Sequence, residues 1–189
     1  QTDEEMLQKM RAAGCRRIQY GIESGSNRTL SSLRKGISLK QIREGVARVK
    51  SLGFTVYGDF MVGSPGETRE DVINTINFAI ALDLDYVNFS VVTPYSHTEL
   101  YDLGFKKGLY NKDYWKEFAK NPKEGFVPEV WEENLSREEL NELLTTAYRS
   151  FYLRPRYILK RVLEVRSSQD LWRKARTGIK MLQKKMLEL

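Results

Sequence analysis

The sequence predicts an α/β fold with three parallel strands and a helical C-terminal region. Two observations carry this prediction. Strand-like apolar runs alternate with amphipathic helical segments along the first half of the chain, and the alternation stops near residue 98. In addition, two of the strands end in glycine-flanked acidic segments, at 21–25 and 58–68. Such strand-to-helix corners are where parallel α/β proteins bind their ligands.

Caps and periodicity place the elements of the first half. We expect helices at 4–13, 38–52 and 69–82, and strands at 17–22, 54–62 and 86–92. Gly14 tolerates the left-handed conformation that often ends a helix. Ser38 and Gln41 have the spacing of a capping box, and Thr68 is a candidate N-cap. This strand–helix series predicts a parallel sheet with right-handed crossovers.

The second half of the chain predicts helices and an irregular aromatic stretch. Residues 98–135 should form one or two short helices whose aromatic side chains make a packed core. Ser136 opens a longer helix, Pro155 interrupts it, and further helices follow. We therefore divide the chain into residues 1–103 and a helical C-terminal region, 104–189, with a basic tail.

Composition restricts the class of protein. Of the 189 residues, 41% are hydrophobic and 30% are charged, as in ordinary globular proteins. No apolar run approaches the roughly 20 residues of a membrane span, and the polar N-terminus is not a signal peptide. The single cysteine, Cys15, excludes an internal disulfide and favours the cytoplasm. The chain opens without Met inside a predicted helix, so we interpret it as a piece of a longer protein.

The net charge of +6 is concentrated at one end. Residues 154–189 hold eleven Lys or Arg and only three acidic residues. Such a segment is usually a solvated helix face. It could also hold an anionic substrate, an anionic membrane surface or RNA phosphates.

The two acidic corners contain groups that suit a polar ligand. Glu23 and Asp59 can accept hydrogen bonds from an amine or from ribose hydroxyls. Glycines such as Gly58, Gly63 and Gly66 let the backbone approach a planar ligand, and N–H groups after a strand can hold carboxylate or ribose oxygens. The P-loop and Rossmann glycine patterns are both absent from the sequence.

Three segments resemble the last part of the radical S-adenosylmethionine (SAM) core in order and spacing. They read GIESGS at 21–26, GFTVYGDFMVGSPGETRED at 53–71 and DYVNFSVVTPY at 85–95. The resemblance covers roughly residues 5–103 and implies that the three strands are part of a partial (β/α) barrel of the TIM type. FYLRPRY at 151–157 and the basic end resemble the cobalamin-dependent branch, which includes the anaerobic magnesium-protoporphyrin monomethyl ester cyclases.

The resemblance implies roles for individual residues. Glu23 and Ser24 would contact the ribose and amino-acid end of SAM, and Asp59 would point toward the ribose. The other cofactor-binding candidates would surround the adenine: Gly63, Pro65, Gly66 and Glu67 in the second corner, and Val92, Pro94 and Tyr95 after the third strand. In this family a [4Fe–4S] cluster cleaves SAM reductively, giving a 5′-deoxyadenosyl radical that abstracts hydrogen.

The chain departs from the family in its cysteines. The family's cluster needs a loop of three cysteines, and Cys15 is alone here, so we assign no metal ligand and no catalytic residue. We expect the cluster ligands, and a domain for cobalamin if it is used, in a missing N-terminal part of the same protein. That full-length protein would methylate or oxidatively cyclise an unactivated carbon of a small molecule. The 189-residue chain alone should be inactive.

Several alternatives stay open. A radical SAM RNA-modifying enzyme of the methylthiotransferase type would use the basic tail against phosphates, although a nucleic-acid partner is disfavoured. A non-catalytic α/β interaction module would have no SAM site. Glu23 could instead pair with Arg28 or Arg34, Asp59 could form a structural ion pair, and His97 could reach substrate or lie on the surface. The bare edge of the first strand should be covered by self-association or by the tail.

Overall fold

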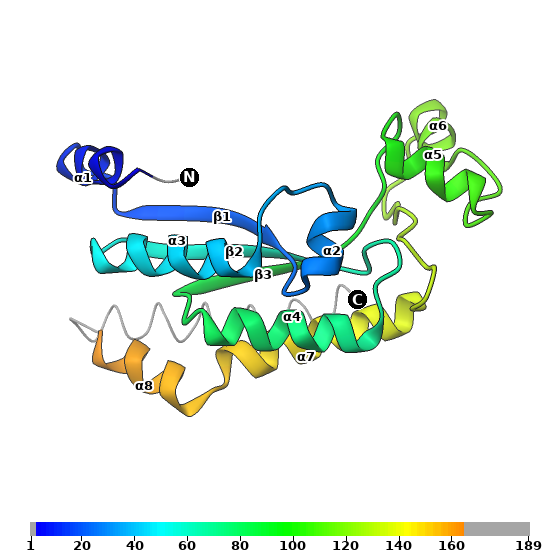
Figure 1. Cartoon of the computed structure of the whole chain (residues 1–189). Helices are drawn as coiled ribbons and strands as arrows, with labels where there is room; N and C mark the ends of the chain where they lie inside the picture. The colour runs from blue at the N-terminus through cyan, green and yellow to red at the C-terminus, as the bar shows by residue number, and fades with distance from the viewer. Residues whose placement is uncertain (1–2, 165–189) are drawn as a thin grey trace.

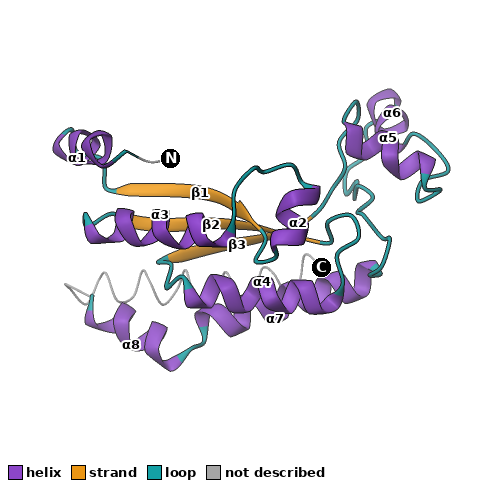
Figure 2. Ribbon diagram, in the orientation of Figure 1, coloured by secondary structure: helices purple, strands orange, loops and turns teal. Residues whose placement is uncertain are grey.

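The computed structural model describes residues 3–164 of the chain (Figures 1 and 2). The strands are β1 (Arg17–Glu23), β2 (Thr55–Val62) and β3 (Tyr86–Val91). The helices are α1 (Glu4–Ala12), α2 (Asn27–Ser32), α3 (Leu39–Ser51), α4 (Arg69–Ala81), α5 (Glu99–Lys106), α6 (Tyr114–Lys120), α7 (Arg137–Tyr152) and α8 (Pro155–Leu163). Strands and helices alternate as far as β3 and helices follow, so the predicted α/β class is confirmed.

The three strands form one parallel sheet in the order β1–β2–β3. Along β2 every second residue is buried and the others are half-buried. One face of the sheet is therefore tightly packed and the other is more open. The register aligns Gly21, Asp59 and Asn88 in one row across the sheet, and Asp59 belongs to the half-buried set, so this row lies on the more open face.

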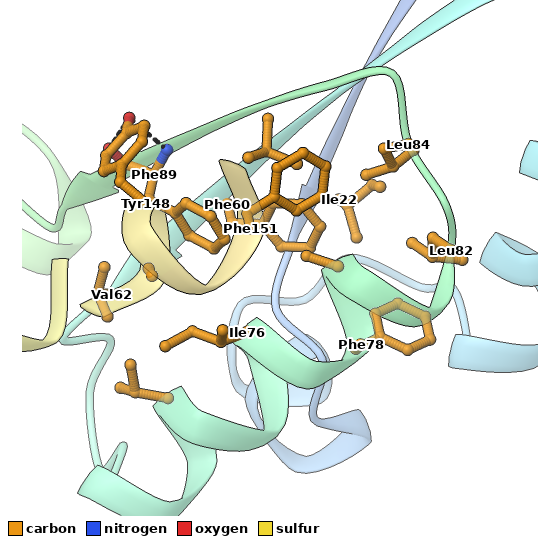
Figure 3. Close-up of a cluster of buried hydrophobic side chains, with 14 of the residues drawn as sticks. Ile22, Phe60, Val62, Ile76, Phe78, Leu82, Leu84, Phe89, Tyr148 and Phe151 are labelled. Atoms are coloured by element: carbon orange, nitrogen blue, oxygen red, sulfur yellow. Dashed lines mark hydrogen bonds between the residues drawn. The ribbon is translucent and has the colours of Figure 1, made fainter. Parts of the chain in front are cut away.

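The main core lies between the sheet and helices α4 and α7. Phe60 and Phe89 stack with ring centroids 5.2 Å apart, and Tyr148 of α7 meets Phe89 edge-on. Phe151 fills the space beside them (Figure 3). Because α7 shares this core with the strands, the helical region packs as part of the same unit. The expected division at residue 103, which lies within α5, stays a prediction.

The helix starts follow the predicted capping signals. Ser38, Thr68 and Ser136 head complete capping boxes at α3, α4 and α7. Pro155 lies in the first turn of α8, where its missing N–H is not needed. The sequence reading gave no range for α2, whose N-cap is Ser26.

Two tyrosines of α7 cover the outer edge of β3. The hydroxyl of Tyr148 accepts the N–H of Phe89 at 2.9 Å and lies 3.0 Å from the Phe89 carbonyl oxygen. The hydroxyl of Tyr152 accepts the N–H of Val87 at 3.0 Å and donates to the Val87 carbonyl at 2.8 Å. Helical side chains thus take the hydrogen-bonding place that a further strand would occupy.

The first part of the basic tail binds the turn that leads into β3. Arg161 of α8 donates to the side chain and the carbonyl of Asp85 at 2.9 and 2.7 Å, and Lys160 lies 3.4 Å from the same carboxylate. Burial raises the pKa of Asp85, but the Val56 N–H and the two cations outweigh it and hold that pKa below its usual range. These cations are thus used within the fold, while residues 165–189 lie outside the described residues.

Helices α5 and α6 form a lobe beyond the carboxyl ends of the strands (Figure 1). Tyr101, Tyr110 and Tyr114 make a separate buried cluster there, which confirms the expected aromatic packing. The Tyr114 hydroxyl donates to the Pro94 carbonyl at 2.8 Å. The lobe is therefore fixed to the end of β3.

Candidate functional site

The more open face of the sheet carries a polar pair in its middle. Asp59 of β2 is half-buried, and Oδ2 of its carboxylate accepts a hydrogen bond from Gln19 Nε2 of β1 at 2.7 Å. No ion pair with a Lys or Arg is found for Asp59 within residues 3–164. The carboxylate therefore keeps acceptor capacity on the face where a ligand could lie.

Glu23 ends β1 in a left-handed conformation, with φ of +70°. Its carboxylate folds back over Gly21: a Cβ atom added to Gly21 would lie 2.7 Å from Glu23 Oε1. Lys35, in the loop after α2, pairs with that oxygen at 2.9 Å and donates to the Gly21 carbonyl at 3.3 Å. The partner of Glu23 is thus Lys35, and neither of the two arginines considered from the sequence.

Ser24 is fully buried, and its hydroxyl is used inside the fold. Its Oγ lies 3.2 Å from Thr75 Oγ1 of α4 and accepts the Ser26 N–H at 3.1 Å. The next residue, Gly25, approaches α4 so closely that an added Cβ would lie 2.6 Å from Thr75 Cα. The structure places the Ser24 side chain where it positions the corner, so its expected ligand contact stays a prediction.

The corner after β2 is a tight turn whose N–H groups are already bonded. Glu67 N donates to the Ser64 carbonyl at 2.9 Å, with Pro65 and Gly66 between them and Gly66 at φ of +70°. The N–H groups of Gly63 and Ser64 donate to Glu67 Oε2 at 2.8 and 2.9 Å. Gly66 N donates to Glu133 Oε2 at 2.8 Å. Protein acceptors occupy these N–H groups in the structure, and the expected position of the corner near the adenine stays a prediction.

Glu67 itself is almost completely enclosed, with 2% of its surface exposed. Burial raises the pKa of its carboxyl to about 7, although the N–H groups of Ser64 and Gly63 oppose the shift. Its second oxygen, Oε1, has no hydrogen-bond partner within the described residues, and neither does Ser64 Oγ. Glu67 acts on the shape of the corner, and its side chain does not face an open site.

The candidate residues after β3 lie at different depths. Val92 is buried, and its N–H extends the sheet by donating to the Val62 carbonyl at 2.9 Å. Pro94 is buried and its carbonyl accepts Trp115 Nε1 at 2.8 Å. Tyr95 is 63% exposed and stacks on Trp115 with centroids 5.4 Å apart. Only Tyr95 presents an accessible side chain.

The structure places the expected residues within and directly after three neighbouring strands, and it adds others. Sequence reasoning missed Gln19, Lys35, Glu133 and Asn134. Gln19 could have been found, because it lies two residues before Gly21 and so on the same face of β1. The others carry no local signal: 67 residues separate Glu133 from Gly66.

Other candidates lie apart from this site. His97 is exposed, with φ of +62°. Cys15 is half-buried, and its Sγ donates to the Arg17 carbonyl at 3.4 Å. Within residues 3–164, no three His, Cys, Asp or Glu side chains gather as metal ligands, and no helix is long and apolar enough to cross a membrane.

A groove of about 970 Å³ runs along β1. Tyr20, Gly21 and Ile22 of β1 line it together with Ile42 and Val46 of α3. The groove shares Gly21 with the polar face, and its lining also includes the polar residues Asp3, Glu4, Gln41, Glu44 and Arg48.

A family model for the radical SAM superfamily matches residues 1–79, which include Glu23, Asp59 and the corner after β2. The chain belongs to the radical SAM superfamily. Its structure resembles that of coproporphyrinogen III oxidase from Escherichia coli, described as a radical SAM enzyme, with a TM-score of 0.53 and 16% identity over 81% of this chain and 30% of that one. At this identity the likeness concerns the fold, and the strands are confirmed as part of a TIM-type barrel.

Curated relatives of this radical SAM chain differ in how far they match it. An uncharacterized methyltransferase of Pyrococcus horikoshii is 35% identical over 86% of this chain and 34% of its own length. A putative methylthiotransferase of Methanocaldococcus jannaschii is 36% identical over 53% of this chain and 22% of its own. An anaerobic magnesium-protoporphyrin IX monomethyl ester cyclase of Rubrivivax gelatinosus is 24% identical over 82% and 27%. The chain thus spans about a third or less of these relatives.

Proposed function

We propose that this chain supplies one part of the SAM site of an enzyme that methylates or oxidatively cyclises an unactivated carbon of a small molecule. The observation that carries the proposal is the set of polar groups that β1 and β2 bring together on the more open face. It comprises the Asp59–Gln19 pair and the Glu23–Lys35 pair, and the Glu23 carboxylate lies over Gly21, the register partner of Asp59.

The residues present fit the chemical parts of SAM. Asp59 and Glu23 are acceptors for ribose hydroxyls and for the ammonium group, and Lys35 is a cation for the carboxylate. In the corner at 63–67 the N–H groups are bonded to protein acceptors. We therefore propose that the carbonyl oxygens and the apolar surface of the corner contact the adenine.

The [4Fe–4S] cluster does not fit these 189 residues. Such clusters need several cysteine thiolates, and the sequence contains Cys15 alone. We propose that the cluster ligands, and a cobalamin domain if there is one, lie elsewhere in a cytoplasmic full-length protein. The cluster and SAM would supply the radical chemistry, whereas the residues described here would bind and orient SAM. The chain alone would then be inactive.

The extent of the matches favours methyl transfer or cyclisation over RNA modification. The methyltransferase and the cyclase match more than four fifths of the chain, and so reach into the helical C-terminal region. The methylthiotransferase matches about half of it. The helices after β3 are therefore better accounted for by the first two relatives.

The test is SAM binding and turnover by the longest natural form of the protein, prepared without oxygen and with its cluster reconstituted. Asp59→Asn should weaken SAM binding at least tenfold by calorimetry, because a charged acceptor is lost. Asp102→Asn, on the exposed face of α5, is the matched control and should bind SAM like the wild type. Formation of S-adenosylhomocysteine would indicate methyl transfer, and 5′-deoxyadenosine would indicate hydrogen abstraction. A wild-type protein that binds no SAM would refute the proposal and favour a non-catalytic module.

RNA modification is the second candidate, supported by the 36% identity to the methylthiotransferase. It predicts RNA binding that weakens steeply with salt. A gel-shift series at low and physiological salt checks this. The absence of any shift at low salt would remove this candidate.

A further inference from the structure

The corner after β2 is held by a segment that lies far along the chain and outside the residues matched by the family model. We call residues 131–134 the brace. Glu133 Oε2 accepts the Gly66 N–H at 2.8 Å, and Asn134 Nδ2 donates to the Glu67 carbonyl at 3.2 Å. Trp131 N donates to the Val92 carbonyl at 3.1 Å. The brace therefore contacts the backbone of both strand ends that surround the proposed adenine position.

The Glu133 carboxylate is itself fixed on both of its oxygens. Oε2 also accepts Trp131 Nε1 at 3.0 Å, and Oε1 forms an ion pair with Lys107 at the end of α5. The hydrogen bond from Lys107 outweighs the effect of burial and holds the pKa of Glu133 below its usual range. The acceptor for Gly66 thus remains charged near neutral pH.

The corner needs such an external constraint. Gly63 and Gly66 both adopt positive φ, at +81° and +70°, and glycine loses the most conformational freedom when it is ordered. The local bonds of the corner run to Glu67 and Ser64. Gly66 N–H is the one corner N–H that is bonded outside residues 63–67, so its orientation depends on Glu133.

We propose that Glu133 is a positioning residue for SAM binding, with Asn134 as its helper. It does not contact SAM but fixes the corner in the shape that receives the adenine. This inference rests on the proposed SAM site. Through Lys107, Glu133 also joins the α5–α6 lobe to that corner.

The test compares four variants. Glu133→Met removes both acceptor oxygens at nearly constant size, and Glu133→Gln restores one acceptor oxygen. Glu132→Met is the matched control, because Glu132 accepts the Arg137 N–H at the start of α7 and does not contact the corner. Asn134→Ala, which removes only the Glu67 contact, is the milder variant to use if Glu133→Met fails to fold.

Two measurements keep the inference separate from the proposed function. In hydrogen exchange of the 189-residue chain, Glu133→Met should speed exchange of the peptide containing 63–67, whereas Glu132→Met should not. In the longest natural form, Glu133→Met should raise the SAM dissociation constant about tenfold, and Glu133→Gln should recover part of the loss. The KM for SAM should rise with little change in kcat at saturating SAM.

Each outcome decides something. Unchanged exchange at 63–67 in Glu133→Met would refute the brace, whether or not the protein binds SAM. Faster exchange with an unchanged SAM dissociation constant would make Glu133 a purely structural residue and overturn its positioning role. A wild type that binds no SAM would refute the proposed function. The exchange result would still test whether Glu133 holds the corner at 63–67.

Discussion

The two edges of the sheet end in different ways. At β3, the hydroxyls of Tyr148 and Tyr152 bond the backbone of Phe89 and Val87. At β1, no described strand pairs with the outer edge, and a groove of about 970 Å³ with mixed apolar and charged lining runs beside it. Exposed strand edges invite pairing with another chain. The chain thus closes its barrel wall at β3 by itself and leaves β1 suited to receive a further strand.

This difference gives the expected self-association through β1 a specific form. In the isolated chain, a second copy would pair with β1 beside the groove that α3 helps to line. Within the described residues, α7 and α8 are bound along β3 and the turn before it. Pairing of two isolated chains should therefore occur through β1.

The largest loss of stability should come from Tyr148→Ala, which removes part of the cover of β3. We expect the free energy of unfolding to fall by about 3–5 kcal/mol, because a buried aromatic side chain is lost and the Phe89 N–H loses its acceptor. Urea unfolding followed by circular dichroism measures this. Tyr148→Phe keeps the ring and should lose about 1–3 kcal/mol. Equal losses in both variants would contradict the part assigned to the ring.

The second largest effect should be a pH dependence of stability caused by Glu67. It should be independent of both edges, because Glu67 follows the central strand. Its pKa is raised from 4.5 to about 7, so the folded chain binds this proton more tightly than the unfolded chain does. The resulting stability is fully present below pH 4.5 and is lost as the pH rises to 7, by about 3 kcal/mol. Thermal unfolding across this range should show the fall, and Glu67→Gln should flatten it. Glu70→Gln, an exposed control on α4, should keep the slope.

A third prediction compares matched arginines at the two edges. Tyr57 and Tyr86 stack 4.5 Å apart, with Arg17 at 5.8 Å from the first ring and Arg161 at 4.7 Å from the second. Arg161→Ala should cost about 2 kcal/mol, because its hydrogen bonds to Asp85 are also lost. Arg17→Ala, at the open edge, should cost only about 0.5 kcal/mol. Similar melting shifts for the two variants would mean that the edges are equally well anchored.

The smallest effect should come from Tyr152→Phe and should show whether the two edges open independently. Tyr152→Phe should lower the unfolding free energy by about 1 kcal/mol and should make the Val87 amide exchange faster with solvent. Exchange along β1 should not change. Hydrogen exchange resolved by NMR measures both edges in one sample. A change at β1 as large as that at β3 would show that the sheet opens as a whole.

Much of the fold follows from local signals in the sequence. The capping boxes at Ser38 and Ser136, and the capping role of Thr68, were predictable because cap and partner lie three residues apart. The strands were predictable because each is a short apolar run, marked by glycine in the first two cases and stopped by Pro94 in the third. The cover of β3 was not, because Tyr148 lies 59 residues from Phe89 and a helical tyrosine has no pattern that announces such a partner.

In the candidate site too, some residues could be predicted from local sequence signals and others could not. Glu23 and Asp59 could be chosen from the sequence, since each is an acidic residue of a strand within two positions of a glycine, Gly21 or Gly58. Lys35 could not be assigned, because a loop lysine can reach many positions. The use of the corner N–H groups was not predictable either, because the sequence does not show that the Glu67 carboxylate turns back onto Gly63 and Ser64.

The left-handed backbone at Glu23 has an evolutionary consequence. A residue with a side chain pays about 1–3 kcal/mol to hold such a conformation, and glycine would hold it freely. Drift toward greater stability would therefore replace Glu23 with glycine. A carboxylate retained there against that drift would mark lineages in which the site is still used, and glycine would mark those in which it has been abandoned.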